Sequence, residues 1–187
     1  TFDSNAAGSF DDSVRGNRVV SEVYEPGSTS KVMTMSAIVD QGAANAGSAF
    51  TIPGTLKRGG KVFHDDVAHG TWHLTLAGIL AKSSNIGTIL ASERIGKSKL
   101  YTYLKAFGIG DKTNVGLPGE SGGLFPALEN WSPTTFPTVA FGQGLSVTSL
   151  QAASVFATIA NDGVRVEPRI IESIIAPDGT VTPTPAP

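Results

Sequence analysis

Two short patterns in this 187-residue chain combine side chains that could make and break an acyl bond. In the first, Ser28 lies three residues before Lys31, and residues at that spacing share one face of a helix. A serine hydroxyl is a weak nucleophile until a neighbouring group takes its proton. A lysine amine can take it where burial or nearby positive charge lowers the lysine pKa. The pair therefore predicts nucleophilic serine chemistry, although serine and lysine also fall at this spacing by chance.

The residues just before Ser28 favour its placement at the N-terminus of a helix. Pro26 and Gly27 are typical of a tight turn. The first N–H groups of a helix have no partner inside the helix and can hold an oxyanion, and the helix dipole favours developing negative charge. The turn therefore predicts that Ser28 lies where an acyl transition state could be stabilised.

The second pattern is Ser83-x-Asn85, between two apolar segments of helical spacing. Side chains in such a turn can face a cleft. A second hydroxyl can relay a proton to a leaving group, and an asparagine amide can bind a substrate amide. The same residues also suit an ordinary turn between two helices, so this pattern alone does not decide the chemistry.

Helices are expected to position both patterns. The first is predicted from about Ser28 to about Gln41, with a buried apolar stripe of Val32, Met35, Ile38 and Val39. Two more are predicted over 74–82, with Leu76, Ile79 and Leu80 inward, and over 86–94.

Two further helices are marked by their expected caps. One should begin with Ser98 as its N-cap and reach Gly108. The last has the strongest signal, because Thr148 and Gln151 form a capping box before an apolar run that ends at Gly163. Extended structure is expected near 50–52 and 61–63, and a hairpin should join 169–176 to 180–182, whereas 1–20 and 183–187 are predicted to be loop or linker.

The composition excludes several classes of protein. Fourteen basic and 16 acidic residues give a net charge of −2, which argues against nucleic acid as the main partner. The absence of cysteine excludes disulfides, thiolate metal sites and cysteine catalysis. A hydrophobic fraction of 40% supports the core of one domain, and no apolar run is long enough to span a membrane.

Four ordered segments resemble class B penicillin-binding proteins. Residues 24–31 (YEPGSTSK) resemble the active-site motif of the family, and residues 80–87 (LAKSSNIG) resemble its second motif. Residues 114–120 (NVGLPGE) and 141–148 (FGQGLSVT) resemble later segments in the same order. Because the matches cover almost the whole chain, residues 1–187 are identified as similar to part of a penicillin-binding transpeptidase domain. The resemblance implies an α+β fold of the β-lactamase/transpeptidase type, present here as a helix-rich portion with an incomplete antiparallel sheet.

The resemblance also implies a function. A D,D-transpeptidase cross-links peptidoglycan through a serine acyl-enzyme, which β-lactam antibiotics also form. Ser28 would be the nucleophile and Lys31 its proton acceptor, while Ser83 and Asn85 would relay a proton and contact the substrate amide. Peptidoglycan stem peptides, β-lactams and cell-wall synthesis proteins are the implied partners, and no cofactor or metal is implied. The parent protein would be anchored by an N-terminal helix and act on the extracytoplasmic face of the bacterial membrane.

One family motif has no counterpart in the sequence. The third motif, Lys-Thr-Gly, lies on an edge strand in the family and supplies an oxyanion donor. Residues 112–114 (KTN) are a decoy, because they precede the NVGLPGE segment that should come before the third motif. Loss of one oxyanion donor typically costs about 100- to 1,000-fold in rate. We therefore expect this chain, as a truncated domain that also lacks the first strand of the family sheet, to be weakly active or inactive alone.

Other interpretations of the sequence remain to be tested. A serine β-lactamase shares the Ser-x-x-Lys pattern, with Glu129 and Asn130 the nearest candidates for activating water, and a non-catalytic binding module is a third class. A group of acidic and histidine residues suggests a metal site, namely His64, Asp65, Asp66, His69 and His73. The favoured interpretation of this group is a solvated loop. Trp72 and Trp131 are expected to pack, and Gly142-Gln143-Gly144 is expected to shape a turn against the active site without a catalytic role.

Overall fold

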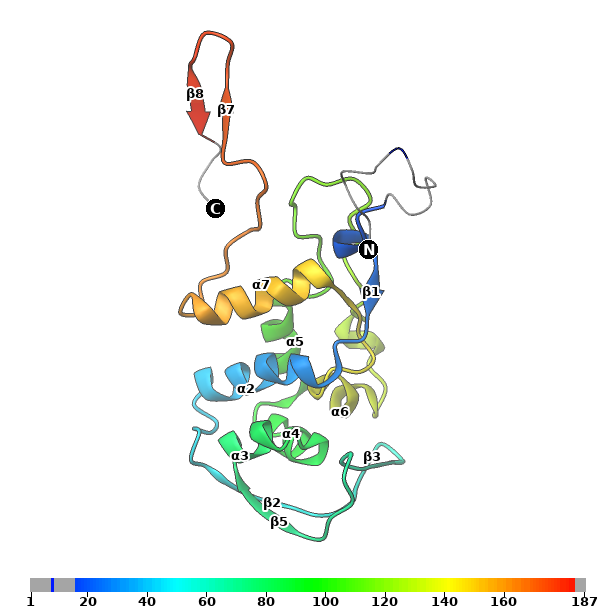
Figure 1. Ribbon diagram of the computed structural model, residues 1–187. Coiled ribbons are helices and arrows are strands. Elements are labelled where there is room, and N and C mark those ends of the chain that lie inside the picture. Colours follow the sequence, from blue (N-terminus) through cyan, green and yellow to red (C-terminus); the bar gives the residue numbers. More distant parts are fainter. Residues whose placement is uncertain (1–7, 9–15, 184–187) are drawn as a thin grey trace.

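The computed structural model describes residue 8 and residues 16–183, which form a stack of helices with short antiparallel strands around it (Figure 1). The central helix α2, Lys31–Asp40, contacts both α4, Asn85–Ser92, and α5, Gly96–Ala106. On one side of this layer lies α7, Ser149–Ala160, and on the other lie α3, Leu76–Ala81, and a two-stranded sheet. Two short helices are α1, Arg18–Ser21, and α6, Thr135–Ala140, and two 3-10 turns are η3, Gly27–Ser30, and η4, Leu128–Asn130.

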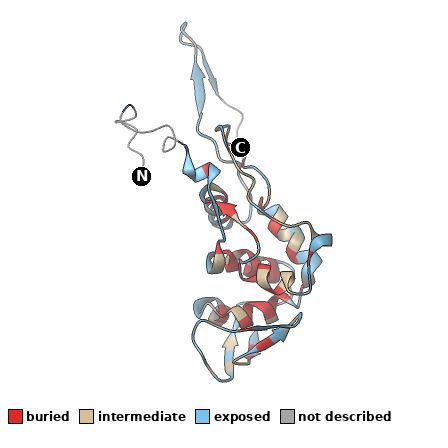
Figure 2. Cartoon of the chain, turned by 90° about the vertical axis from the view of Figure 1, so that its right-hand side faces the viewer, coloured by how far each residue is buried: buried red, intermediate tan, exposed pale blue. Residues whose placement is uncertain are grey.

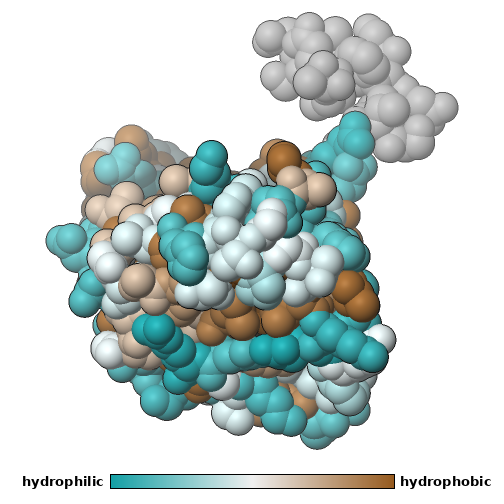
Figure 3. All heavy atoms as spheres, turned by 90° about the horizontal axis from the view of Figure 1, so that it is seen from below, coloured by the Kyte–Doolittle hydropathy of each residue, from teal (hydrophilic) through white to brown (hydrophobic). Residues whose placement is uncertain are grey.

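Within the described residues, the strands form four separate antiparallel pairs. In chain order they are β1 Val23–Tyr24, β2 Ala49–Ile52, β3 Leu56–Arg58, β4 Lys61–Phe63, β5 Trp72–Thr75, β6 Val147–Thr148, β7 Ser173–Ile175 and β8 Val181–Pro183. β1 pairs with β6, β2 with β5, β3 with β4 and β7 with β8. The expected extended pieces near 50–52 and 61–63 are confirmed, while their partners β3 and β5 were not anticipated. Viewed from below, the end of the molecule near β2 and β5 is largely hydrophilic, with hydrophobic atoms in a narrow band (Figure 3).

The core lies between α2, α4 and α5. Its fully buried side chains include Ile38 from α2, Ile86 and Ile89 from α4, and Leu100 and Leu104 from α5. Figure 2 shows this concentration of buried residues in the middle of the stack, whereas the β7–β8 hairpin is exposed along its length. Burial of these aliphatic side chains stabilises the helix stack, at about 1.5 to 3 kcal/mol for each.

The apolar stripe expected on the first helix is partly wrong. Met35 and Ile38 are buried, but Val39 is 50% exposed. The buried face of α2 instead includes Lys31 and Thr34, and the Thr34 hydroxyl donates to the carbonyl of Ala140 at 2.8 Å. Two polar residues therefore lie on the inward face of α2. A prediction from the apolar residues alone assigned Val39 to the buried face, although it lies on the exposed one. Leu80 on α3 is similarly 38% exposed rather than inward.

The predicted capping box on α7 is confirmed. The Thr148 N–H donates to Gln151 Oε1 at 2.7 Å, and the Gln151 N–H donates to Thr148 Oγ1 at 3.1 Å. The predicted cap at Ser98 is wrong, because α5 begins earlier, at Gly96, with Ile95 in the N-cap position. Gly96 has a φ of 75°, which lets the chain reverse directly from the end of α4 into α5.

The C-terminal hairpin is confirmed, although its first strand is shorter than the expected 169–176. The expected loop over 1–20 contains the short helix α1, while residues 1–7 and 9–15, and residues 184–187 of the expected tail, lie outside the described residues. Trp131 packs as expected, 8% exposed, with its ring against Tyr101 and Phe125. Among the described residues, no helix is long and apolar enough to cross a membrane.

Candidate active site

Ser28 lies in the 3-10 turn η3, immediately before α2, and its side chain is exposed. Gly27 has a φ of 54°, a conformation that favours glycine and that turns the chain into η3. Within the turn, the Thr29 hydroxyl donates to the carbonyl of Pro26 and the Ser30 hydroxyl donates to the carbonyl of Gly27, each at 2.8 Å. The flanking hydroxyls therefore rigidify the turn and leave Ser28 facing solvent.

The glycine turn expected at 142–144 lies directly against η3. The Gly27 N–H donates to the carbonyl of Gly142 at 2.9 Å. A Cβ atom on Gly142 would lie 2.1 Å from both the Gly27 oxygen and Ser30 Oγ, so only glycine fits at this contact. The Gly144 N–H donates to Glu25 Oε1 at 2.8 Å on the other side of the turn. This segment, which the sequence predicted to shape a turn against the active site, fixes the position of the serine-bearing loop.

Lys31 is the first residue of α2 and is completely buried. Its ammonium group Nζ donates to the carbonyl oxygen of Ser83 at 2.5 Å and to Ser83 Oγ at 3.0 Å. Burial lowers the pKa of Lys31 to about 8, while the negative charges of Asp65 and Asp66 oppose that shift. A lysine with this pKa exists in both charge states near neutral pH, which a proton acceptor requires.

Ser83 has a φ of 54°, in the left-handed region that non-glycine residues seldom occupy. Its N–H donates to the carbonyl of Leu80, and the Ser84 N–H donates to the carbonyl of Ile79, each at 3.0 Å. These two bonds form the Schellman motif that commonly ends a helix, where the left-handed residue is usually glycine. A serine there costs on the order of 1 kcal/mol of backbone strain and supplies a hydroxyl that glycine lacks.

Asn85 is the first residue of α4 and is half-buried. Its Nδ2 donates to the carbonyl of His64 at 3.3 Å, a long hydrogen bond to the neighbouring loop. Ser84, between Ser83 and Asn85, is the N-cap of α4 and accepts from the Gly87 N–H at 2.8 Å. The turn between α3 and α4 is thus held from both sides.

The structure brings Lys31 and Ser83 into direct contact and places Asn85 two residues further along the same turn. Ser28 stands one helical turn before Lys31, and its hydroxyl has no hydrogen-bond partner among the described residues. The nucleophile candidate is therefore free to meet a ligand, whereas its basic partner is tied to the second motif.

The interpretation of residues 64–73 as a solvated loop is wrong for two of its side chains. Asp65 and His69 are 5% and 4% exposed, and their side chains meet at 3.0 Å. Asp65 Oδ2 also accepts from Ser84 Oγ at 2.6 Å, and Asp65 Oδ1 accepts from the Ile86 N–H at 2.9 Å. Burial alone would raise the pKa of Asp65, but the hydrogen bonds from Ser84, Ile86 and His69 outweigh it and lower the pKa. Sequence reasoning missed the contacts of Asp65 with Ser84 and Ile86 because they join residues 19 and 21 positions apart.

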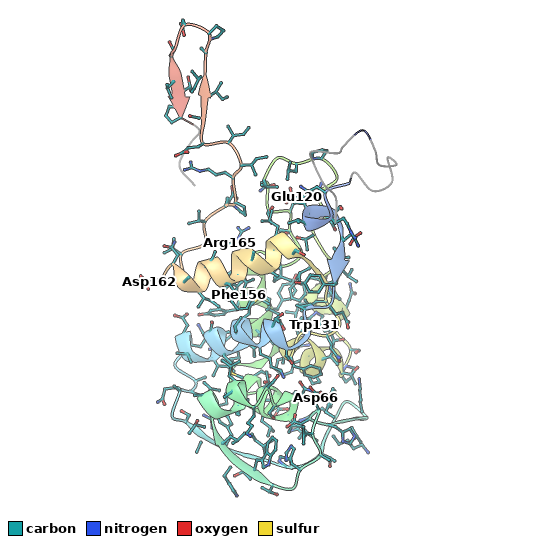
Figure 4. The ribbon with its side chains drawn as sticks, viewed as in Figure 1. Asp66, Glu120, Trp131, Phe156, Asp162 and Arg165 are labelled. Carbon is teal, nitrogen blue, oxygen red and sulfur yellow. The ribbon has the colours of Figure 1, made fainter. Side chains whose placement is uncertain are left out.

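The other members of the histidine and acidic group, His64, Asp66 and His73, do not join the contact between Asp65 and His69. His73 lies on β5, where its Nδ1 is 3.3 Å from Thr51 Oγ1. Trp72 packs as expected, with its ring stacked on the imidazole of His69 at 3.6 Å between centroids. No group of three or more potential ligands among the described residues could hold a metal ion. Asp66 is exposed, level with α4 (Figure 4), and borders a cavity of about 450 Å³ with His64, Asp65 and His69.

Comparison with known proteins gives a consistent result across the chain. The family model for the penicillin binding protein transpeptidase domain matches residues 1–187. Penicillin-binding protein PbpB of Mycolicibacterium smegmatis is 47% identical over 183 residues, which is 97% of this chain and 28% of that protein. Peptidoglycan D,D-transpeptidase FtsI of Escherichia coli is 36% identical over 186 residues, which is 95% of this chain and 31% of that protein.

Solved structures agree with the sequence matches. Penicillin-binding protein 3 of Mycobacterium tuberculosis in complex with aztreonam superimposes with a TM-score of 0.90 at 45% identity, covering 92% of this chain and 38% of that one. The same protein has been solved in complex with ampicillin. The fold is therefore that of a β-lactamase/transpeptidase domain, as the sequence predicted, with mixed helices and short antiparallel strands. The chain spans less than a third of the length of the curated relatives named above.

Proposed function

This chain belongs to the penicillin-binding protein transpeptidase family, and we propose that it carries the serine nucleophile of a peptidoglycan D,D-transpeptidase. In the proposed reaction, Ser28 Oγ bonds to the carbonyl carbon of the penultimate D-Ala of a stem peptide. The C–N bond to the terminal D-Ala breaks, and the serine proton reaches the departing amine. An amine of a second stem peptide then attacks the ester, forms the cross-link and restores the Ser28 hydroxyl.

One observation supports this proposal above the others, namely the burial of Lys31 against Ser83. With a pKa of about 8, roughly one lysine in ten is neutral at pH 7. At the ordinary pKa of about 10.4, only about four in 10,000 would be neutral. Burial thus raises the neutral fraction by more than a hundredfold and makes Lys31 a plausible acceptor for the proton of Ser28.

The hydrogen bonds of Lys31 extend the proposed proton path. Because Nζ lies 3.0 Å from Ser83 Oγ, a proton accepted from Ser28 can pass along that contact toward a leaving amine. Asn85 begins α4, and its contact with the loop at His64 supports a role for its side-chain amide in binding a substrate amide. We propose the same four residues for β-lactam binding, in which the ring C–N bond opens and the leaving amine stays attached.

The proposal extends to the cellular setting. One relative of this chain is named as a peptidoglycan D,D-transpeptidase, and peptidoglycan lies outside the cytoplasmic membrane. We therefore propose that the full-length protein acts at the extracytoplasmic face and that residues 1–187 form one part of its transpeptidase domain. The isolated chain should be acylated more slowly than the full-length protein, because the sequence holds no Lys-Thr-Gly motif to complete the oxyanion site.

A turnover assay tests this function. The full-length protein that contains this chain is incubated with a synthetic stem peptide ending in D-Ala-D-Ala, with and without an acceptor amine, and released D-Ala is measured. We expect release that depends on the peptide, is lost in Ser28→Ala, and falls at least 100-fold in Lys31→Met. Rapid repeated hydrolysis of nitrocefin with no D-Ala release would instead identify a β-lactamase and contradict the proposal.

A further inference from the structure

The buried carboxylate of Asp65 ties the loop 64–70 to the turn that holds Ser83 and Asn85. It accepts from Ser84 Oγ at 2.6 Å through Oδ2 and from the Ile86 N–H at 2.9 Å through Oδ1. Ser84 Oγ accepts in turn from the Gly87 N–H. One carboxylate therefore fixes both the N-cap and the first turn of α4, where negative charge is also favoured by the helix dipole.

Asp65 is connected to the proposed reacting groups, Lys31 and Ser83, through a single residue, Ser84. Ser84, which Asp65 holds, follows Ser83, whose carbonyl and hydroxyl both accept from Lys31 Nζ. Ser83 is held in a left-handed conformation that it would not favour alone. A strained residue persists where its surroundings determine its position, and here the Schellman bonds act on one side and the Asp65 contacts on the other.

The position of Asp65 is itself fixed by aromatic packing. His69 Nε2 lies 3.0 Å from Asp65 Oδ2, and His69 Nδ1 lies 2.6 Å from the carbonyl of Gly70. The ring stacks on Trp72, which completes a chain of contacts from β5 through His69 and Asp65 to α4.

We propose that Asp65 is a positioning residue for acylation, which acts through Ser84 and the first turn of α4 to keep Ser83 and Asn85 in register with Lys31. This inference rests on the proposed function and adds a residue that touches none of the reacting atoms. Asp65 also acts on Lys31 by its charge, as Asp66 does, and both carboxylates favour the protonated amine. The two effects of Asp65, contact and charge, can be separated by substitution.

Three variants of the full-length protein make the test. Asp65→Asn removes the charge and disrupts the contact with Ser84, whose hydroxyl donates to the carboxylate. Asp66→Asn is the matched control, because Asp66 is exposed and exerts the same kind of charge effect without a hydrogen bond to α4 among the described residues. Ser84→Ala removes the same contact from the other side, together with the N-cap bond from the Gly87 N–H, and leaves both charges in place. The measurement is the second-order rate constant for acylation by ampicillin from pH 6 to pH 10.

We expect Asp65→Asn to lower the plateau rate constant by about 10- to 100-fold, the effect of a small misplacement of reacting groups. It should also move the acidic limb of the profile to lower pH, because loss of the carboxylate lowers the pKa of Lys31 further. Asp66→Asn should move the limb in the same direction and keep the wild-type plateau. Ser84→Ala should lower the plateau and leave the limb unmoved. His64 and His69 are the other titratable groups of this loop, and they are unchanged in all three variants.

The outcomes separate this inference from the proposed function. Wild-type acylation with equal plateaus in wild type and Asp65→Asn would overturn the positioning role while leaving the function intact. A wild-type protein that ampicillin does not acylate at all would overturn the function and this role together. If Asp65→Asn fails to fold, Ser84→Ala still decides, since a wild-type plateau in that variant would equally contradict the contact.

Discussion

The two turns that meet at Lys31 are held in place by different forces. The turn that bears Ser28 is fixed by backbone contacts with the glycine segment 142–144, where Gly142 leaves no room for a Cβ atom. The turn that bears Ser83 is fixed by side chains, above all by the buried Asp65 and its partners Ser84 and His69. The first arrangement depends on volume and the second on charge and hydrogen bonding.

This difference suggests a division of tasks. The turn that bears the nucleophile candidate Ser28 (the nucleophile turn) carries no buried charge besides Lys31 at its end, so the rest of its geometry should be insensitive to pH. The Ser83 turn packs against the buried carboxylate of Asp65, so it should respond to protonation and to the charge state of nearby groups. A volume change should therefore damage the first turn most, and a charge change should damage the second.

The substitution expected to lower the free energy of unfolding most is Gly142→Ala. A Cβ atom would lie 2.1 Å from two atoms of the nucleophile turn, and Gly142 has a φ of 89°. Overpacking and left-handed strain together should lower the free energy of unfolding by on the order of 3 to 5 kcal/mol. Urea unfolding of the 187-residue chain measures this loss.

Gly163→Ala is the control for that prediction. Gly163 has a φ of 83°, but a Cβ atom there would meet nothing within 4 Å. Backbone strain alone should cost about 1 to 2 kcal/mol. Equal losses at positions 142 and 163 would show that close packing against the nucleophile turn contributes nothing.

The next effect concerns Lys31, where the two turns meet. Its pKa is about 8 in the folded chain and about 10.5 in the unfolded chain, so the unfolded chain binds more protons between these values. The free energy of unfolding should therefore rise with pH across this window, by about 3 kcal/mol at most. Below pH 8 the buried charge costs stability, and the gain appears as the amine loses its proton.

The contribution of Lys31 is obtained by comparing wild type with Lys31→Met from pH 7 to pH 10.5. The difference between their unfolding free energies should change with pH in favour of the wild type as the pH rises. A difference that stays constant would mean that the lysine keeps its ordinary pKa, and the proposed proton acceptor would lose its main support.

The smallest expected effect is that of Glu25→Gln. Glu25 is an exposed carboxylate that accepts from the Gly144 N–H at 2.8 Å, and glutamine keeps an acceptor at that place. The unfolding free energy should change by less than about 0.5 kcal/mol. Acylation of the full-length protein should stay near the wild-type rate. A fall in the acylation rate as large as that expected for Asp65→Asn would show that charge holds both turns, and the proposed difference between them would be wrong.

The sequence predicted the parts of this molecule that depend on local chemistry. The capping box of Thr148 and Gln151 is a short-range pattern, and it was confirmed in both of its hydrogen bonds. The Ser83 turn was also placed correctly, because two apolar helices flank it. The stripe on α2 was partly misplaced, because the inward face includes Lys31 and Thr34, which a search for apolar residues passes over.

Long-range contacts account for what the sequence did not show. Asp65 was taken as part of a solvated loop, and its burial depends on Ser84 and Ile86, which are far along the chain. The close approach of Gly142 to Gly27 likewise joins segments more than 100 residues apart. The N-cap of α5 is Ile95 rather than Ser98, because the left-handed φ of 75° at Gly96 already turns the chain from α4 into α5.

The most direct test of the account is the site of covalent labelling. The full-length protein is treated with ampicillin and digested with trypsin, which releases the peptide of residues 19–31 by cleavage after Arg18 and Lys31. Mass spectrometry should find one ampicillin adduct in that peptide, on Ser28, and none in Ser28→Ala. An adduct on any other residue, or an unlabelled protein under conditions that label a known penicillin-binding protein, would contradict the assignment of Ser28 as the nucleophile.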